Sequence, residues 1–175
     1  VSTSRDVGGT SFDVAVIHEG QIEFARTTEM AGLAIKVPML DIHTVGAGGG
    51  SIGWVDPGGA LRVGPDSAGA DPGPACYGRG GDQPTVTDAN LVLGRLATRS
   101  AMAGGFELDV AAARQAADTL ATALSMSIEE TAEGMIHVVN AAMTSSIRRL
   151  TVEPGHDPAN FSLCPCVCAG TLHGA

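Results

Sequence analysis

Aromatic and basic residues are scarce in this sequence. Aromatic residues make up 3% of the chain, and 10 Lys and Arg residues stand against 19 Asp and Glu residues. The formal net charge is therefore −9. Nucleic acids and anionic membranes are bound by clustered Lys and Arg side chains, so this balance argues against both as partners. A phosphate ligand would have to be held by backbone N–H groups and a metal ion.

Long apolar runs and a regular cysteine framework are also lacking. No segment has the unbroken apolar length of a membrane span, and the N-terminus lacks a basic region followed by an apolar one. The cysteines are Cys76 alone and Cys164, Cys166 and Cys168 together, unlike the even spacing of a small secreted domain. These features predict a cytoplasmic protein with reduced thiols.

Glycine, in contrast, is abundant, with 24 residues, and it marks the most informative segment, Asp6–Asp13. The letters DVGGTSFD predict a strand, a tight glycine turn and a second strand. Glycines allow a sharp bend and the close approach of a ligand, and the amides of such a turn converge on phosphate oxygens. The candidate phosphate-binding residues are Gly8, Gly9, Thr10 and Ser11, and the candidate Mg²⁺-binding residues are Asp6 and Asp13. The residues alone leave a plain β-hairpin with solvated aspartates equally open.

The whole chain, 1–175, is expected to form a single partial lobe with four successive parts. Residues 1–63 are mainly strands, 64–86 form an ordered loop rich in Gly and Pro, 87–152 are helical, and 160–175 contain a returning strand and a turn. This order predicts an α/β fold in which helices pack on a mixed sheet.

Apolar periodicity and capping residues predict the individual elements. The expected strands are Val1–Val7, Phe12–His18, Gln21–Thr28, residues 51–55, residues 61–63 and one that begins at Asn160. A short helix is expected over Thr87–Leu96. Asp109 is the expected N-cap of a helix that ends at Leu124, and Ser127 has capping-box spacing to Glu130 ahead of a long helix that ends near Arg148.

Several segments, read together, resemble the hydantoinase A / 5-oxoprolinase family, which includes large subunits of ATP-dependent ketone carboxylases. The matching segments are Asp6–Asp13, Val37–Ile52, Leu61–Gly78 and Pro84–Asn90. The Gly/Pro loop and the run of three glycines at residues 48–50 are the specific signal. The glycine turn by itself occurs widely in actin-like and sugar-kinase-like ATPases.

The resemblance implies the second lobe of an actin-like, sugar-kinase-like (ribonuclease H-like) ATPase fold, in which ATP binds in the cleft between two lobes. We expect the N-terminal lobe of the relatives to be missing from this chain. The implied cofactors are ATP and Mg²⁺. The implied site residues are Asp6 and Asp13 as catalytic and Mg²⁺-binding carboxylates, Gly8, Gly9, Thr10 and Ser11 at the phosphates, and Gly48, Gly49 and Gly170 at the cleft. A packing role for the glycines of residues 46–50 stays open.

The chain departs from the family near its end. The family has a glycine-rich turn that ends in Gly-Pro-Leu-His and supports the adenosine, whereas this chain reads CPCVCAGTLH. Gly170, Leu172 and His173 fit, but Val167 and Cys168 stand where two glycines are expected. A β-branched residue is poorly suited to a positive φ or to close approach of a nucleotide. We therefore expect an altered adenosine turn.

The cysteine cluster has a second interpretation as a zinc site of Cys164, Cys166, Cys168 and His173. Alternate side chains of a strand lie roughly 6.5 Å apart, whereas sulfurs around tetrahedral zinc lie roughly 3.8 Å apart. A buried or altered segment is therefore the preferred interpretation.

Two further candidates have simple structural alternatives. Cys76 has no base beside it in the sequence, which favours a packed thiol over a nucleophile. Asp41 and His43 face the same way if the chain is extended there, as a substrate or metal contact would require. A packed histidine with a satisfied hydrogen bond is the preferred alternative.

These residues lead to three functional hypotheses. The first is a fragment of an ATP-dependent hydrolase that opens cyclic amides of the hydantoin or 5-oxoproline type through phosphorylated-oxygen activation, with a hydantoinase B-type subunit as candidate partner. The second is a non-catalytic remnant or interaction lobe without a complete ATP cleft. The third is the ATPase subunit of an acetone/acetophenone carboxylase-like enzyme. In each case the chain alone is expected to be inactive.

Overall fold

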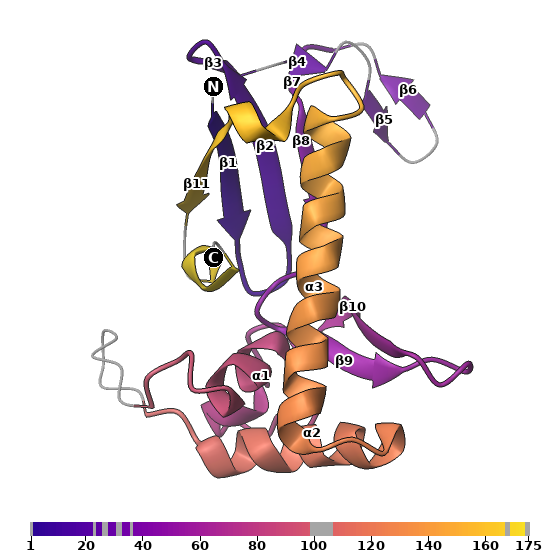
Figure 1. Ribbon diagram of the computed structural model, residues 1–175, viewed down its shortest axis with the longest axis vertical. Helices are drawn as coiled ribbons and strands as arrows, with labels where there is room; N and C mark the ends of the chain where they lie inside the picture. The colour runs from indigo at the N-terminus through magenta and orange to yellow at the C-terminus, as the bar shows by residue number, and fades with distance from the viewer. Residues whose placement is uncertain are drawn as a thin grey trace.

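A five-stranded mixed sheet forms one end of the molecule (Figure 1). The computed structural model describes residues 2–22, 24–25, 28–30, 33–35, 37–98, 107–166 and 169–173. The strands of the sheet are β1 (Ser2–Val7), β2 (Phe12–His18), β3 (Gln21–Ile22), β8 (Ile42–Val45) and β11 (Ser162–Cys166). Strand β11 runs parallel to β1, and the other pairs are antiparallel. The expected mixed α/β architecture is confirmed.

Strand β2 has two partners on one edge, which the sequence does not reveal. Its second half pairs with β3 across a turn at Glu19 and Gly20, both of which have a positive φ. Its first half pairs with β8, so that Asp13 lies opposite Thr44. The expected single strand Gln21–Thr28 is therefore wrong, because β3 ends at Ile22 and β8 takes the remaining edge.

Two small two-stranded sheets are formed by the chain that follows β3. Strand β4 (Phe24–Ala25) pairs with β7 (Met39–Leu40), and β5 (Thr28–Met30) pairs with β6 (Leu33–Ile35). Pro38 precedes β7 and donates no backbone hydrogen bond, as its position at a strand start permits.

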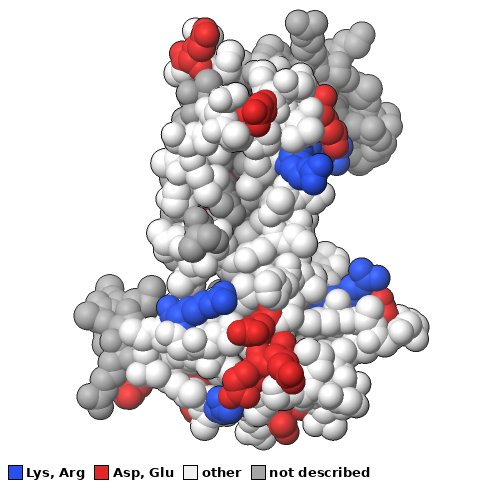
Figure 2. Space-filling model, viewed as in Figure 1, with Lys and Arg blue, Asp and Glu red and all other residues white. Residues whose placement is uncertain are grey.

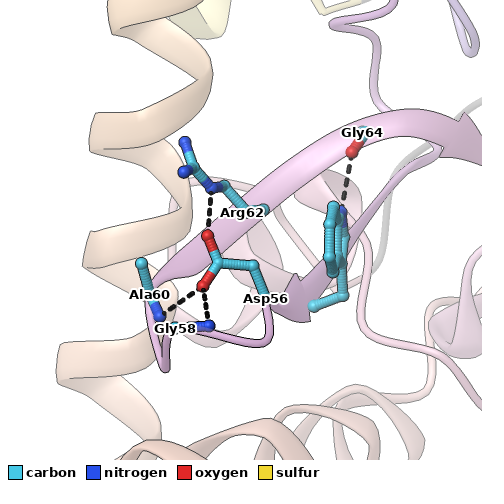
Figure 3. A network of polar contacts seen from close by, with 6 residues as sticks. Asp56, Gly58, Ala60, Arg62 and Gly64 are labelled. Atoms are coloured by element: carbon cyan, nitrogen blue, oxygen red, sulfur yellow. Dashed lines mark hydrogen bonds and ion pairs between the residues drawn. The ribbon is translucent and has the colours of Figure 1, made fainter.

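A separate hairpin consists of β9 (Ser51–Val55) and β10 (Leu61–Ser67). Asp56 organises its turn: the carboxylate accepts hydrogen bonds from the N–H groups of Gly58 and Ala60 and from Arg62 Nε at 2.8 Å (Figure 3). The Ala60 N–H and then the Arg62 guanidinium hold the pKa of the Asp56 carboxyl below its usual range. Strand β10 continues to Ser67 past an irregular register, so the Gly/Pro loop begins four residues later than expected.

The helices carry the caps that the sequence predicts. Helix α2 (Val110–Leu124) begins after Asp109, and α3 (Ile128–Thr151) begins after the Ser127–Glu130 capping box. Helix α1 (Val86–Val92) starts one residue before its expected position and ends four residues early. Single turns of 3-10 helix cover Ala75–Tyr77, Pro158–Asn160 and Gly170–His173, so the returning strand begins at Ser162 rather than Asn160.

Helix α3 joins the two ends of the molecule. It runs along the long axis, beside the sheet at one end and beside α1, α2 and the β9–β10 hairpin at the other (Figure 1). One buried apolar cluster includes Val7, Phe12 and Val14 of the sheet, and Met135 and Met143 of α3. Figure 2 shows an uncharged surface over the middle of this face, with basic side chains in separate small groups. Among the described residues, no helix combines the length and apolar character that crossing a bilayer requires.

Met135 lies at the centre of this core and should be essential for stability. Its side chain is fully buried, whereas Met126, before α3, is 41% exposed. Met135→Ala should lower the free energy of unfolding by about 2–5 kcal/mol, because it removes buried atoms and leaves a cavity. Met126→Ala should change it by less than about 0.5 kcal/mol. Urea denaturation of both variants measures the difference, and equal losses would contradict this assignment of the core.

Candidate functional site

The glycine turn joins β1 to β2 at the end of the sheet that faces the middle of the molecule (Figure 1). The N–H of Gly8 donates to the carbonyl of Ser11 at 3.0 Å, which closes the turn. Asp6 and Asp13 are direct cross-strand partners on either side of it. Side chains of opposed residues in an antiparallel pair lie on the same face of the sheet, so the two carboxylates lie together. Their neighbours Val7 and Phe12 point to the other face and are fully buried.

Asp13 is held in place by two hydroxyl groups. Ser11 Oγ donates to Asp13 Oδ2 at 3.0 Å, and Thr44 Oγ1 donates to Asp13 Oδ1. Partners of this kind orient a carboxylate that ligates a metal. Mg²⁺ is bound in proteins by one or two carboxylates together with water and substrate phosphates. The exposed Asp6 and the oriented Asp13 match this donor set.

The glycine loop of residues 46–50 packs directly on the glycine turn. The N–H groups of Gly49 and Gly50 donate to the carbonyls of Gly8 and Gly9 at 3.0 and 2.5 Å. A Cβ atom at Gly48 would lie 2.7 Å from the carbonyl carbon of Gly9, closer than real Cβ atoms approach such atoms. The two segments meet backbone to backbone. This contact gives Gly48 and Gly49 a packing role, and it also places them next to the turn.

Gly9 differs from the loop glycines, because the fold leaves space around it. A Cβ atom at Gly9 would meet no heavy atom within 4 Å, and its φ lies outside the left-handed region. Neither packing nor backbone strain therefore requires glycine at this position. Gly9 and Thr10 are exposed. A ligand that approaches the backbone closely is the constraint that would explain the absence of a side chain.

The C-terminal turn lies at the same end of the sheet. Strands β1 and β11 are parallel, so their carboxyl ends adjoin, and the N–H of Ala169 donates to the carbonyl of Val7 at 3.4 Å. Gly170 is buried in the turn beyond it, beside Pro165. Ligands of open α/β sheets bind outside the carboxyl ends of strands. The structure thus brings Gly170 to the end of β1 that carries the glycine turn.

A cleft of about 530 Å³ lies between this turn and α3. Thr171 and Leu172 line one side, and its other lining residues are Arg95, Glu133, Ile136, His137 and Asn140. His173 Nδ1 lies 2.7 Å from Asn140 Oδ1, which ties the turn to the helix. Val167 and Cys168, on which the expected alteration of the adenosine turn rests, lie outside the described residues.

The remaining candidates occupy separate places. His43 lies half-buried on β8 opposite Val14, and Asp41 precedes that strand. Cys76 is fully buried. Burial, and then the charge of Asp88, raise the pKa of the Cys76 thiol, which is the opposite of what a nucleophile requires.

The zinc interpretation gains no support from the described residues. Cys164 is exposed on β11, whereas the buried His173 contacts α3. In the part of the chain that the structure describes, no three His, Cys, Asp or Glu side chains are grouped to hold a metal ion. Cys168 lies outside that part.

Three hydroxyl residues that lie near the turn were not predicted from the sequence. Besides Thr44, these are Ser67, whose Oγ lies 3.3 Å from Thr10 Oγ1, and Thr87, whose Oγ1 donates to the Gly49 carbonyl at 2.9 Å. The position of Thr87 could have been predicted, because Thr85 and Asp88 have capping-box spacing and place Thr87 in the first turn of a helix. Thr44 and Ser67 reach the turn only through tertiary contacts.

The sequence model of the Hydantoinase/oxoprolinase family matches residues 3–175. The chain belongs to this family. It is 46% identical to caprolactamase subunit alpha of Pseudomonas jessenii, over 96% of this chain and 24% of that protein. It is 44% identical to 5-oxoprolinase 1 of Arabidopsis thaliana, over 96% of this chain and 14% of that protein. This hydantoinase/oxoprolinase chain thus spans a quarter or less of these relatives.

Solved structures show the same fold. The crystal structure of ATP-dependent caprolactamase from Pseudomonas jessenii matches with a TM-score of 0.89 and 45% identity, over 98% of this chain and 25% of that one. The nucleotide-free structure of acetone carboxylase, from work on ATP-dependent acetone carboxylation, matches with a TM-score of 0.88 and 33% identity, over 98% of this chain and 24% of that one. The expected fold class, an α/β lobe of an actin-like ATPase, is confirmed.

The contact between the two glycine segments gives a stability prediction. Gly48→Ala should lower the free energy of unfolding by about 1–3 kcal/mol, because its Cβ forces the loop away from the turn. Gly9→Ala, in open space, should leave it unchanged or raise it by less than ~1 kcal/mol. Urea denaturation followed by circular dichroism compares them. A Gly48→Ala chain as stable as the parent would refute the close packing.

Proposed function

We propose that this chain forms the phosphate-binding lobe of an ATP-dependent enzyme that opens a cyclic amide. One observation carries the proposal: the open, exposed backbone at Gly9 lies beside the cross-strand carboxylates Asp6 and Asp13, where β1 ends. Converging turn amides and a metal ion can hold phosphate without a basic patch. The relatives named for caprolactam and 5-oxoproline suggest the amide substrate.

In this proposal the residues of the turn bind and orient the terminal phosphates. The N–H groups of Gly9 and Thr10 and the hydroxyl of Thr10 would face the phosphate oxygens. Gly8 would shape the turn beside them through its own N–H, and Ser11 would keep Asp13 oriented. Asp6 and Asp13 would hold Mg²⁺, which neutralises phosphate charge when bound. Gly48 and Gly49 would pack on the turn and maintain its conformation. Gly170 would lie at the part of the cleft that binds the nucleoside.

The amide oxygen would take the terminal phosphoryl group, and ADP would leave. A first water would then add to the amide carbon and the ring C–N bond would break, which leaves an acyl phosphate. A second water would hydrolyse the acyl phosphate to a carboxylate and phosphate.

The rest of the enzyme belongs to the same proposal. A further lobe would supply the other half of the ATP cleft, in line with relatives that extend far beyond the matched region. A second subunit of the hydantoinase B type would be a partner, in line with a relative named as a subunit alpha. We also propose that the chain works in the cytoplasm and that its four parts form one lobe.

Titration with Mg·ATP tests the phosphate site. In ¹⁵N-labelled chain, the amide resonances of Gly8, Gly9 and Thr10 should shift, because these residues line the proposed phosphate site. Gly9→Ala should weaken binding about tenfold or more, since its methyl group occupies the space of the phosphate. Asp13→Asn should still bind ATP weakly but lose the gain from Mg²⁺. Shifts confined to other segments would refute this site, and no shift would favour the non-catalytic lobe.

A second candidate function is that of an ATPase subunit in ketone carboxylation. The 33% identity and close structural match with acetone carboxylase favour it. Both functions share the ATP site and differ in the acceptor of the phosphoryl group. The choice therefore depends on parts of the enzyme beyond the phosphate turn.

Substrate-dependent ATP turnover distinguishes the two functions. With the chain joined to the remaining parts of its enzyme, cyclic amides should stimulate ADP release, and ketone plus bicarbonate should not. Asp13→Asn should abolish the stimulated rate, because a metal-binding carboxylate is removed. Stimulation by ketone plus bicarbonate alone would favour the carboxylase. Unchanged turnover in Asp13→Asn would refute the role of Asp13.

A further inference from the structure

Asp88 is a fully buried carboxylate that lies outside the phosphate turn. Its Oδ1 accepts a hydrogen bond from the Cys76 N–H at 2.8 Å. Its Oδ2 accepts from the Ala75 N–H at 3.2 Å, the Thr85 N–H at 3.0 Å and Thr85 Oγ1 at 2.7 Å. All these donors are neutral. A buried carboxylate is costly unless its oxygens are well bonded, and here both are.

These bonds join two distant segments at one residue. Ala75 and Cys76 belong to the single 3-10 turn of the Gly/Pro loop, whereas Thr85 and Asp88 form the capping box of α1. The loop is held at its other end as well, since the Ala68 N–H donates to the Gly50 carbonyl at 2.9 Å. The long loop is therefore anchored at Asp88 and at the glycine loop.

Thr87, in the first turn of α1, links this helix to the glycine loop that packs on the phosphate turn. Its N–H and its Oγ1 both donate to the Gly49 carbonyl, at 2.8 and 2.9 Å. Gly49 in turn donates its N–H to Gly8, in the turn itself. The capping box fixes the backbone of the helical turn that carries Thr87, so a change at Asp88 alters the support of Gly49.

We propose that Asp88 is a positioning residue for the phosphate turn. Its buried bonds hold the first turn of α1, Thr87 holds the glycine loop, and the loop holds Gly8 and Gly9 in the geometry that phosphate requires. The consequence for ligand binding rests on the proposed function, whereas the support of the glycine loop does not. The family resemblance implies site roles for the glycine turn, Gly48, Gly49 and Gly170, and it assigns none to Asp88.

The chain contains a natural control for this role. Ser127 and Glu130 form a capping box with the same bonds, in which Ser127 Oγ donates to Glu130 Oε2 at 2.7 Å and accepts from the Glu130 N–H at 3.2 Å. That box is exposed and starts α3, far along the chain from the glycine loop. Thr85→Ala and Ser127→Ala therefore delete equivalent hydroxyls, and only the first is joined to Gly49.

Hydrogen exchange compares these variants without any ligand. Thr85→Ala should speed exchange of the Gly49 and Gly50 N–H groups about fivefold or more, as expected for the loss of a capping bond, while amides in the middle of α3 keep their rates. Asp88→Asn should have a larger effect, because an amide presents donor hydrogens where a carboxylate oxygen accepts. Ser127→Ala should leave Gly49 and Gly50 unchanged. If Asp88→Asn does not fold, the Thr85→Ala result still tests the positioning role.

Mg·ATP titration of the same variants separates this inference from the proposed function. Thr85→Ala should weaken binding about fivefold and Ser127→Ala should not. Unchanged exchange at Gly49 and Gly50 in Thr85→Ala, or an equal increase in Ser127→Ala, would overturn the positioning role. If exchange changes as expected but the parent chain binds no Mg·ATP, the positioning role is supported and the proposed function fails.

Discussion

The backbone contact between the glycine turn and the glycine loop is the constraint on which the rest of the site depends. Gly49 and Gly50 donate to Gly8 and Gly9, and a side chain at Gly48 would collide with the turn. The two segments can pack this closely because glycine has no Cβ atom. The contact leaves the outer side of the turn open at Gly9. It also joins the sheet to the helical end of the molecule.

The parallel pair β1–β11 explains why residues from both ends of the chain meet at this turn. A parallel partner brings the carboxyl end of β11 beside that of β1, so the glycine turn and the Gly170 turn extend from the same sheet edge. Helix α3 packs beside the sheet and shares a buried core with Val7 of β1. The lobe thus presents together the two turns that we propose to face the phosphates and the nucleoside of ATP.

Local patterns predicted most elements, because their causes are local. The caps at Asp109 and Ser127 begin helices where expected, and the Gly8–Gly9 turn joins two strands as expected. The strand Gln21–Thr28 failed, since apolar alternation does not show which neighbour occupies a sheet edge. The short α1 was misplaced because Thr85 and Asp88 form a capping box within a loop-like sequence. In the site, the turn residues were predicted, whereas Thr44, Ser67 and Thr87 were not.

The family, the α/β class and the glycine turn with its two carboxylates could be predicted before the structure, because these depend on residue order and short-range geometry. Three contacts became evident only in the folded chain: Thr44 orients Asp13, the glycine loop packs on the turn, and a buried Asp88 joins the Gly/Pro loop to α1. Each of these contacts joins residues at least a dozen positions apart in the chain, except the capping box itself. Their pairing follows from sheet register and core packing, which no local pattern encodes.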